Sequence, residues 1–352
     1  MHFLVRSLGF AVACLAGLFA LAAPVSASAL SPLPAAYQGT LPCASCAGIE
    51  YTLVLHSDQS YRLRMVYQGV PGNNRFDDLG RWVMSAHGNL LVLQGQAGDR
   101  MYFRVRSPDL LTLQDLEGRD IVSTLNYTLQ RTEPLPTLVL KLYPLKGMYM
   151  TLADAGLLEE CASGLRYPVQ QAADNARLET VYLKARTAVG QPLMVSLYAQ
   201  LGLVPAAEAG ASSREGIVPL RFEEVLPGAV CPPRLEALPL QNTPWTLFEL
   251  NGKPVAMPES RRPPGLRLDE ESGRLSASGG CNQMVGSYKV DGKSLTMSAL
   301  AATRMACLHS GDVEYELAQA MQNTRHWNVL GDRLQLEDAL GRVLARFNRQ
   351  PD

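Results

Sequence analysis

Seven cysteines constrain the fold of this 352-residue chain more than any other residue type. Cys14 lies in an apolar N-terminal segment, and the other six fall into three local pairs. The pairs are Cys43 with Cys46, Cys161 with Cys231, and Cys281 with Cys307. Proline-rich stretches at residues 132–136 and 232–239 separate the pairs, and proline disfavours a continuing helix or sheet. We therefore expect three small domains, each with its own cysteine pair.

The N-terminal residues 1–29 have the pattern of a Sec signal peptide. Arg6 supplies the positive start, an apolar run covers residues 8–23, and small residues precede a cleavage site after Ala29. This pattern predicts export to the periplasm. The residues before Cys14 loosely resemble a lipoprotein cleavage site, so lipidation of Cys14 with outer-membrane association is the alternative. No second apolar span follows, so we expect no transmembrane segment after signal removal.

Charge and compartment narrow the functional classes. Without the signal segment the chain keeps 31 basic and 33 acidic residues, a net charge of −2. With no basic run, it offers no surface for a phosphate backbone, and we expect no nucleic-acid partner. Six cysteines in an exported chain indicate disulfides first, because the reducing systems of the cytosol are absent there.

The first segment, residues 30–131, alternates apolar and polar residues with the period of a half-buried strand. Tyr61 and Leu63 fall on one face, for example, and Arg62 and Arg64 on the other. Similar runs begin at Tyr51, Trp82, Leu90, Met101 and Leu110. They predict an antiparallel meander that closes into a small, lipocalin-like barrel.

The second segment, residues 140–235, mixes strand and helix patterns. Leu178, Val181, Tyr182 and Ala185 share one face of a helix that opens near Asn175. Residues 205–214, rich in Ala, Gly and Ser, predict a loop. A bridge between the cysteines at 161 and 231 would contribute about 4 kcal/mol in the chain-entropy treatment, which favours a structural disulfide.

The third segment, residues 240–350, carries three hairpin signals, of which Asn251-Gly252 is the strongest. A helix is expected from Asp312. Its buried stripe comprises Val313, Leu317, Ala320 and Met321. A Cys281–Cys307 disulfide is the expected staple. The whole chain is predicted to be mainly β with minor α.

Specific motifs resemble known families. Residues 37–49, which include Cys43 and Cys46, resemble the N-terminal domain of the NlpE envelope lipoproteins. Residues 146–149, 164–169 and 178–185 resemble the OB-like C-terminal domain of the same family. This resemblance implies an OB-like barrel, and that Cys161 and Cys231 form that domain's disulfide.

The last segment resembles the META domain of the heat-shock protein HslJ. The matching residues are Trp245, Asn251-Gly252, 278–282, 286–288, 303–307 and Glu314. This resemblance implies an α+β fold. The NlpE resemblance implies a role in copper homeostasis or envelope stress signalling, by binding or sensing, with an envelope stress sensor protein as partner.

The chemistry of the Cys43–Cys46 pair stays open among a disulfide, a redox sensor and a copper(I) site. A thioredoxin-like oxidoreductase is a further alternative, but a strand rather than a helix follows Gly48. Zinc would need two more ligands. Copper(I) accepts two soft thiolates, and the expected thioether helpers are Met65, Met84 or Met101. An oxidising periplasm favours the disulfide.

No enzyme motif is present, so we expect binding rather than turnover. Arg62, Arg64, Arg104 and Arg106 are interpreted as a solvated strand face rather than an anion site. The histidines outside the signal segment are not spaced as metal ligands; they are His56, His87, His309 and His326. The alternative function is a structural or small apolar ligand-binding envelope protein, with the ligand inside the first barrel.

Overall fold

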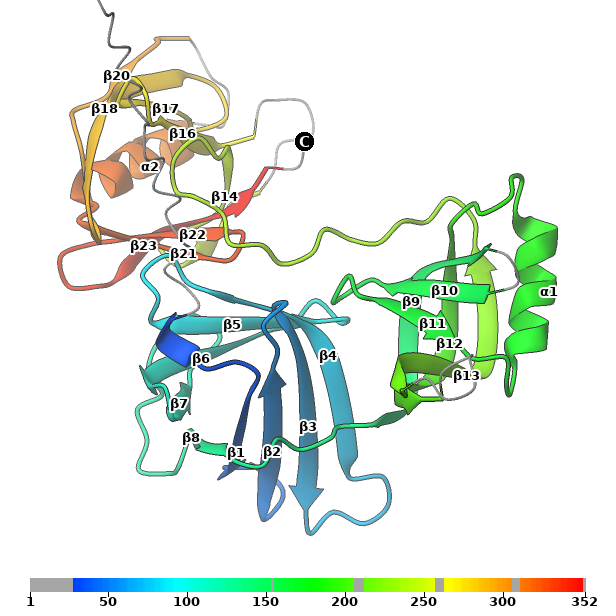
Figure 1. The fold of residues 1–352 in the computed structure, drawn as a ribbon. Helices are drawn as coiled ribbons and strands as arrows, with labels where there is room; N and C mark the ends of the chain where they lie inside the picture. The colour runs from blue at the N-terminus through cyan, green and yellow to red at the C-terminus, as the bar shows by residue number, and fades with distance from the viewer. Residues whose placement is uncertain (1–27, 153–154, 206–211, 257–262, 306–310, 351–352) are drawn as a thin grey trace, which may run out of the picture.

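The computed structural model describes residues 28–152, 155–205, 212–256, 263–305 and 311–350. It has three lobes, arranged along the chain in the order of the three cysteine pairs (Figure 1). The first lobe, coloured blue to cyan, contacts both the green middle lobe and the yellow-to-red third lobe. The fold is mainly β with two α-helices in the described part of the chain, as the sequence predicts.

The first lobe is a closed antiparallel barrel of eight strands in sequential order. They are β1 (Ala35–Leu41), β2 (Gly48–Leu55), β3 (Ser60–Gln68), β4 (Arg75–Met84), β5 (Leu90–Gly95), β6 (Arg100–Ser107), β7 (Leu110–Leu113) and β8 (Thr128–Thr132). The barrel closes because β1 pairs with β8. The predicted meander is confirmed.

Side chains fill the interior of this barrel. Tyr37, Trp82 and Phe103 are among the buried residues of one core cluster that draws on most of the strands. A short 3-10 helix, Ser28–Leu30, leads into β1, and Leu30 is fully buried in the same cluster. The expected cleavage site after Ala29 therefore directly precedes a residue that packs in the barrel core.

The middle lobe is a closed five-stranded barrel with the order β10-β11-β13-β12-β9. Its elements are β9 (Leu140–Leu152), β10 (Ala155–Glu160), β11 (Arg166–Val169), α1 (Asn175–Ala185), β12 (Leu193–Val204) and β13 (Arg214–Leu226). The predicted helix is confirmed. It buries Leu178 and Tyr182, whereas Ala185 is exposed, so the buried stripe ends one turn earlier than predicted. Most of the predicted 205–214 loop lies outside the described residues.

The third lobe is a ten-stranded antiparallel sheet with one helix. Its elements are β14 (Trp245–Leu250), β15 (Lys253–Pro254), β16 (Gly265–Asp269), β17 (Arg274–Ser278), β18 (Gln283–Asp291), β19 (Ser294–Met297), β20 (Ala301–Ala302), α2 (Gly311–Asn323), β21 (His326–Leu330), β22 (Arg333–Glu337) and β23 (Val343–Arg349). The predicted hairpin turn is present, with positive φ at Asn251 (51°) and Gly252 (76°). A Cβ on Gly279 would lie 2.4 Å from the Cα of Glu314, so glycine lets the helix approach the sheet.

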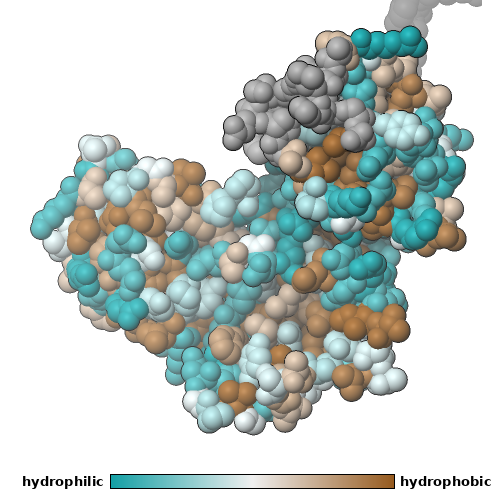
Figure 2. Space-filling view, turned by 180° about the vertical axis from the view of Figure 1, so that it is seen from behind, coloured by the Kyte–Doolittle hydropathy of each residue, from teal (hydrophilic) through white to brown (hydrophobic). Residues whose placement is uncertain are grey.

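The lobes are joined by apolar as well as polar contacts. A buried cluster combines Val83, Val92 and Tyr102 of the first barrel with Leu330 of the third lobe and Leu235 of the linker. On the face shown in Figure 2, hydrophobic residues lie in groups among hydrophilic ones. Within the described ranges, no helix is long and apolar enough to cross a membrane.

Candidate functional site

The Cys43–Cys46 pair lies in the loop between β1 and β2, at one end of the first barrel. The two sulfurs form a disulfide, and the Cα atoms are 5.3 Å apart. Both cysteines are half-buried, while Ala44 and Ser45 between them are exposed. The bond therefore lies at the surface, within reach of a small reductant or a metal carrier.

Strand pairing holds this loop from both sides. The Ala47 N–H donates a 3.1 Å hydrogen bond to the Gln68 carbonyl oxygen on β3. A Cβ on Gly48 would lie 2.7 Å from Thr40 Cγ2, which explains why glycine follows the pair. A disulfide over so short a loop contributes only about 2 kcal/mol in the chain-entropy treatment, because it restricts few residues of the unfolded chain, and the paired strands bring the loop ends together without it. Its reduction can therefore leave the barrel closed.

The three methionines expected as copper ligands lie on three different strands of the barrel. Met84 ends β4 at the hairpin to β5, the end of the barrel opposite the β1–β2 loop. Met65 pairs with Tyr51 inside the β2–β3 ladder, and Met101 lies on β6, across the barrel. Among the described residues, no group of three or more His, Cys, Asp or Glu side chains could hold a metal. When reduced, the loop offers two thiolates, a donor set that fits two-coordinate copper(I).

A second disulfide joins Cys161 to Cys231, with the Cα atoms 5.1 Å apart. It closes a separation of 70 residues and ties the linker after β13 to the end of β10. Chain entropy gives this bond about 4 kcal/mol, roughly twice the contribution of the first disulfide. Cys307, the expected partner of Cys281, lies outside the described residues, as does Cys14.

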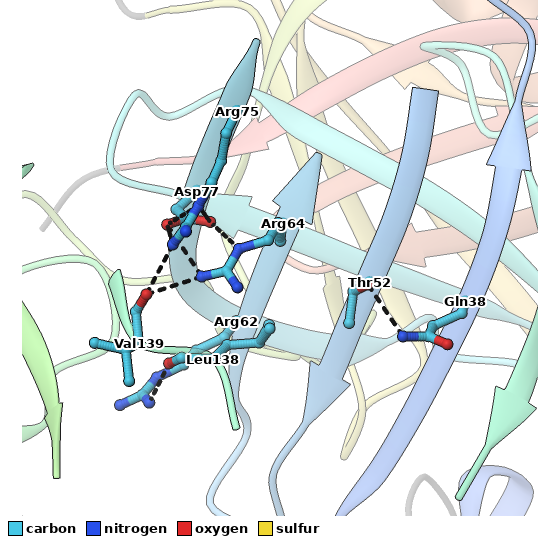
Figure 3. Close-up of polar contacts among 8 residues, drawn as sticks. All are labelled: Gln38, Thr52, Arg62, Arg64, Arg75, Asp77, Leu138 and Val139. Carbon is cyan, nitrogen blue, oxygen red and sulfur yellow. Dashed lines mark hydrogen bonds and ion pairs between the residues drawn. The ribbon is translucent and has the colours of Figure 1, made fainter. Parts of the chain in front are cut away.

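Arginines on the outer face of β3 and β4 hold the linker that enters the middle barrel (Figure 3). Arg64 and Arg75 pair with the Asp77 carboxylate at 2.7 and 2.6 Å. Each also donates a 2.8 Å hydrogen bond to the Val139 carbonyl oxygen. One carboxylate thus orients two guanidinium groups toward a single backbone oxygen.

Arg62 extends this contact to the middle barrel itself. It is buried, donates a 3.0 Å hydrogen bond to the Leu138 carbonyl oxygen and pairs with Glu215 of β13 at 2.8 Å. The interpretation of Arg62 and Arg64 as a solvated strand face is therefore wrong, because the linker and the middle barrel cover them. Arg104 and Arg106 pair instead with Asp120 of their own barrel.

A partly buried carboxyl group, that of Asp78, lies beside these arginines, between the first and middle barrels. Asp78 Oδ2 accepts a 2.6 Å hydrogen bond from the Tyr61 hydroxyl, and burial raises the Asp78 pKa. Burial also raises the pKa of Glu160, and Asp78 contributes to that rise. Gly95 makes room for the aspartate, because a Cβ there would lie 2.2 Å from Asp78 Oδ2.

The described histidines do not form a metal site. His87 donates a 2.7 Å hydrogen bond through Nε2 to the Trp327 carbonyl oxygen, which joins the first and third lobes. Burial lowers the pKa of His56, and nearby Arg62 lowers it further. His309 lies outside the described residues.

Comparison with known proteins places these features in a family. Residues 37–124 match the NlpE N-terminal domain and residues 140–232 match the NlpE C-terminal OB domain. Over 192 residues the chain is 35% identical to lipoprotein NlpE of Escherichia coli K12, covering 54% of this chain and 78% of that protein.

The chain belongs to the NlpE family.

Two solved structures are similar to parts of this chain. The crystal structure of the Cpx pathway activator NlpE from Escherichia coli is 31% identical, with 57% of this chain and 98% of that chain covered, at a TM-score of 0.24. A lipoprotein structure from Shewanella oneidensis is 31% identical and covers 29% of this chain and 90% of that one, at a TM-score of 0.25. The third lobe is an addition to the two NlpE domains, because residues 238–351 match the META domain.

Sequence reasoning located the cysteines but missed the residues that join this NlpE-type barrel to its neighbours. Asp77 and Asp78 were not identified, although two adjacent carboxyls inside an alternating strand pattern are an unusual signal. Gly95 gave another signal, since a glycine at the end of a strand often marks a close approach. Neither signal names the partner, because the partners lie far away in sequence.

Proposed function

We propose that this chain is a periplasmic, NlpE-type sensor of envelope stress in which the Cys43–Cys46 pair responds to redox state or to copper(I). The observation that carries the proposal is the disulfide itself, which lies half-buried in a surface loop whose flanking strands are paired independently. Such a bond can open and close without unfolding the barrel. The kinship with a Cpx pathway activator supports an envelope stress sensor protein as the partner.

The proposed chemistry has two exclusive states. As a disulfide the pair has no thiolate to offer, and as a dithiol it offers two soft donors to copper(I). Copper(I), when bound, would be held by Cys43 and Cys46. The chain acts by binding and sensing rather than by turnover, and no described residue is assigned a catalytic role.

Export to the periplasm agrees with the proposed sensing role. A signal peptide cleaved after Ala29 would start the mature chain at Leu30, which packs in the barrel core. Lipidation of Cys14 would instead anchor a longer chain to the outer membrane. Mass spectrometry of the mature N-terminus separates these two outcomes. The alternative function is the binding of an apolar ligand inside the first barrel. The described interior argues against it, because side chains such as Trp82 and Phe103 already pack there.

The experiment is a thiol titration of the purified mature protein. Mild reductant should release Cys43 and Cys46 to rapid alkylation while Cys161 and Cys231 stay protected, and copper(I) should then block that alkylation. A Cys43→Ser/Cys46→Ser chain should lose both effects and any stress-signalling response in cells. Unchanged signalling by that chain would contradict the proposal.

A further inference from the structure

A third sulfur lies beside the Cys161–Cys231 disulfide. The Sδ atom of Met194 is 3.8 Å from Cys161 Sγ, and each of these two residues is only 4% exposed. Both are held by backbone pairing to the same strand, β9. The Cys161 N–H donates a 3.1 Å hydrogen bond to the Lys146 carbonyl oxygen, and Met194 pairs with Met148. Two sulfurs are therefore held together by the sheet, independently of the disulfide.

The linker would keep the third sulfur, Cys231 Sγ, nearby after the disulfide opens. Three residues further on, Arg234 pairs with Glu159 of β10 at 2.9 Å. The next residue, Leu235, is buried in the cluster that includes Val83 and Leu330. Arg234 thus holds the linker to the middle barrel, and Leu235 holds it to the first and third lobes, so a free Cys231 remains opposite Cys161.

A cavity gives access to these sulfurs. It measures about 420 Å³, and its walls include Cys161, Met194, the β5–β6 hairpin at residues 94–98 and the linker residues on either side of Cys231, at 229–230 and 232–235. Lys146 also lines it. A small ion could therefore reach the site without separation of the lobes.

We propose that the reduced form of this site binds one soft monovalent cation, copper(I) or silver(I), through Cys161, Cys231 and Met194. Two thiolates and a thioether are the donors that such cations prefer. A metal–sulfur bond of about 2.3 Å places two sulfurs of a trigonal site about 4 Å apart. Cys161 and Met194 already have that separation, and only the Cys231 side chain must rotate away.

Metal binding at this site requires the reduced state of Cys161 and Cys231. That state exists before the two thiols are oxidised, or after a dithiol reduces the disulfide and is itself oxidised to a disulfide. Binding releases the two thiol protons, so the complex carries one net negative charge, beside Lys146 of the same cavity. The adjacent Glu160 carboxylate is turned away, since it accepts hydrogen bonds from the N–H groups of Ala162 and Ser163 at 2.8 and 2.7 Å.

This site is distinct from the Cys43–Cys46 loop, which lies between β1 and β2 of the first barrel. Metal binding and disulfide formation exclude each other here. A soft cation captured by the newly exported chain would therefore delay the bond that ties the linker to the middle barrel.

The test uses the mature chain with serine at positions 43, 46, 281 and 307, so that only this pair remains. The protein is reduced with a phosphine, freed of it anaerobically, and titrated with copper(I) against the chromophoric ligand bicinchoninate. We expect one ion per chain. Met194→Leu should weaken binding about tenfold, or about 1.4 kcal/mol, and the matched control Met101→Leu on β6 should not. The oxidised chain should bind no ion here.

Equal affinity in the Met194→Leu and Met101→Leu chains, or no binding to the reduced chain, would overturn the proposal. Because Cys43 and Cys46 are absent, neither result depends on the function proposed for them. If the four-serine chain does not fold, reduced wild type is compared with Cys161→Ser/Cys231→Ser. A difference of one bound ion supports the site, and no difference overturns it.

Discussion

The hydroxyl of Tyr61 and the hydroxyl of Tyr143 meet on one carboxylate. Tyr61 donates to Asp78 Oδ2 at 2.6 Å within the first barrel, and Tyr143 of β9 donates to Asp78 Oδ1 at 3.3 Å from the middle barrel. Both tyrosines are buried. A single acidic group therefore joins two domains, and its protonation state bears on how firmly they pack.

Asp78 should make stability depend on pH. Burial is the largest influence and raises its pKa above the ordinary value of 3.8, although the bond from Tyr61 lowers it in part. A raised pKa means that the folded state favours the neutral carboxyl, so the stability it contributes is present below pH 3.8 and is lost as pH rises through the folded pKa. The melting temperature of Asp78→Asn, relative to that of wild type, should therefore rise between pH 3.5 and pH 7. A melting-temperature difference that stays constant over this range would contradict the raised pKa of Asp78.

Gly95→Ala should destabilise the protein by about 2 to 4 kcal/mol. The added Cβ would lie 2.2 Å from Asp78 Oδ2 and push the carboxylate off both tyrosines. Urea denaturation measures the cost. In an Asp78→Ala background the same substitution should cost much less, because the clashing group is gone. If the two changes are additive, the clash is not the cause.

Asp77→Asn should loosen the linker between the first two barrels. It weakens the pairing that orients Arg64 and Arg75 toward the Val139 carbonyl oxygen. Thermolysin cleavage within residues 133–139 should become on the order of tenfold faster, matching about 1.4 kcal/mol less protection against local opening. Asp120→Asn is the matched control, since that carboxylate pairs with arginines of the same barrel but not with the linker. Equal rates in both variants would argue against the clamp.

The two described disulfides should differ in their contribution to stability. Cys161→Ser/Cys231→Ser should lower the free energy of unfolding by about 4 kcal/mol and Cys43→Ser/Cys46→Ser by about 2 kcal/mol. The difference arises because Cys161 and Cys231 close a far longer loop. Chemical denaturation of the two variants under oxidising conditions measures both. A larger loss at the Cys43–Cys46 loop would mean that this bond is chiefly structural.

Local patterns predicted the elements of this fold well. Alternation around Tyr61 marked a strand, the Asn251-Gly252 turn marked a hairpin, and the spacing of Leu317 and Met321 marked a helix. These features depend on neighbours a few residues apart, which sequence shows directly.

Contacts between the lobes could not be predicted in the same way. The alternating sequence around Arg62 is the same whether its side chain faces water or Glu215. Arg62 and Glu215 are 153 positions apart in the chain. The sulfur contact of Met194 with Cys161 likewise depends on both strands flanking β9. Burial of a polar residue is decided by the assembled fold, so its partner appears only in three dimensions.

The measurement that tests the central claim most directly is the alkylation rate of Cys43 and Cys46 in the purified mature protein, followed by mass spectrometry of the peptides. We predict that mild reductant exposes these two thiols first, that one equivalent of copper(I) then protects them, and that the barrel stays folded by circular dichroism throughout. Thiols at positions 43 and 46 that resist mild reduction, or that copper(I) leaves fully reactive after reduction, would contradict a sensing role for this pair.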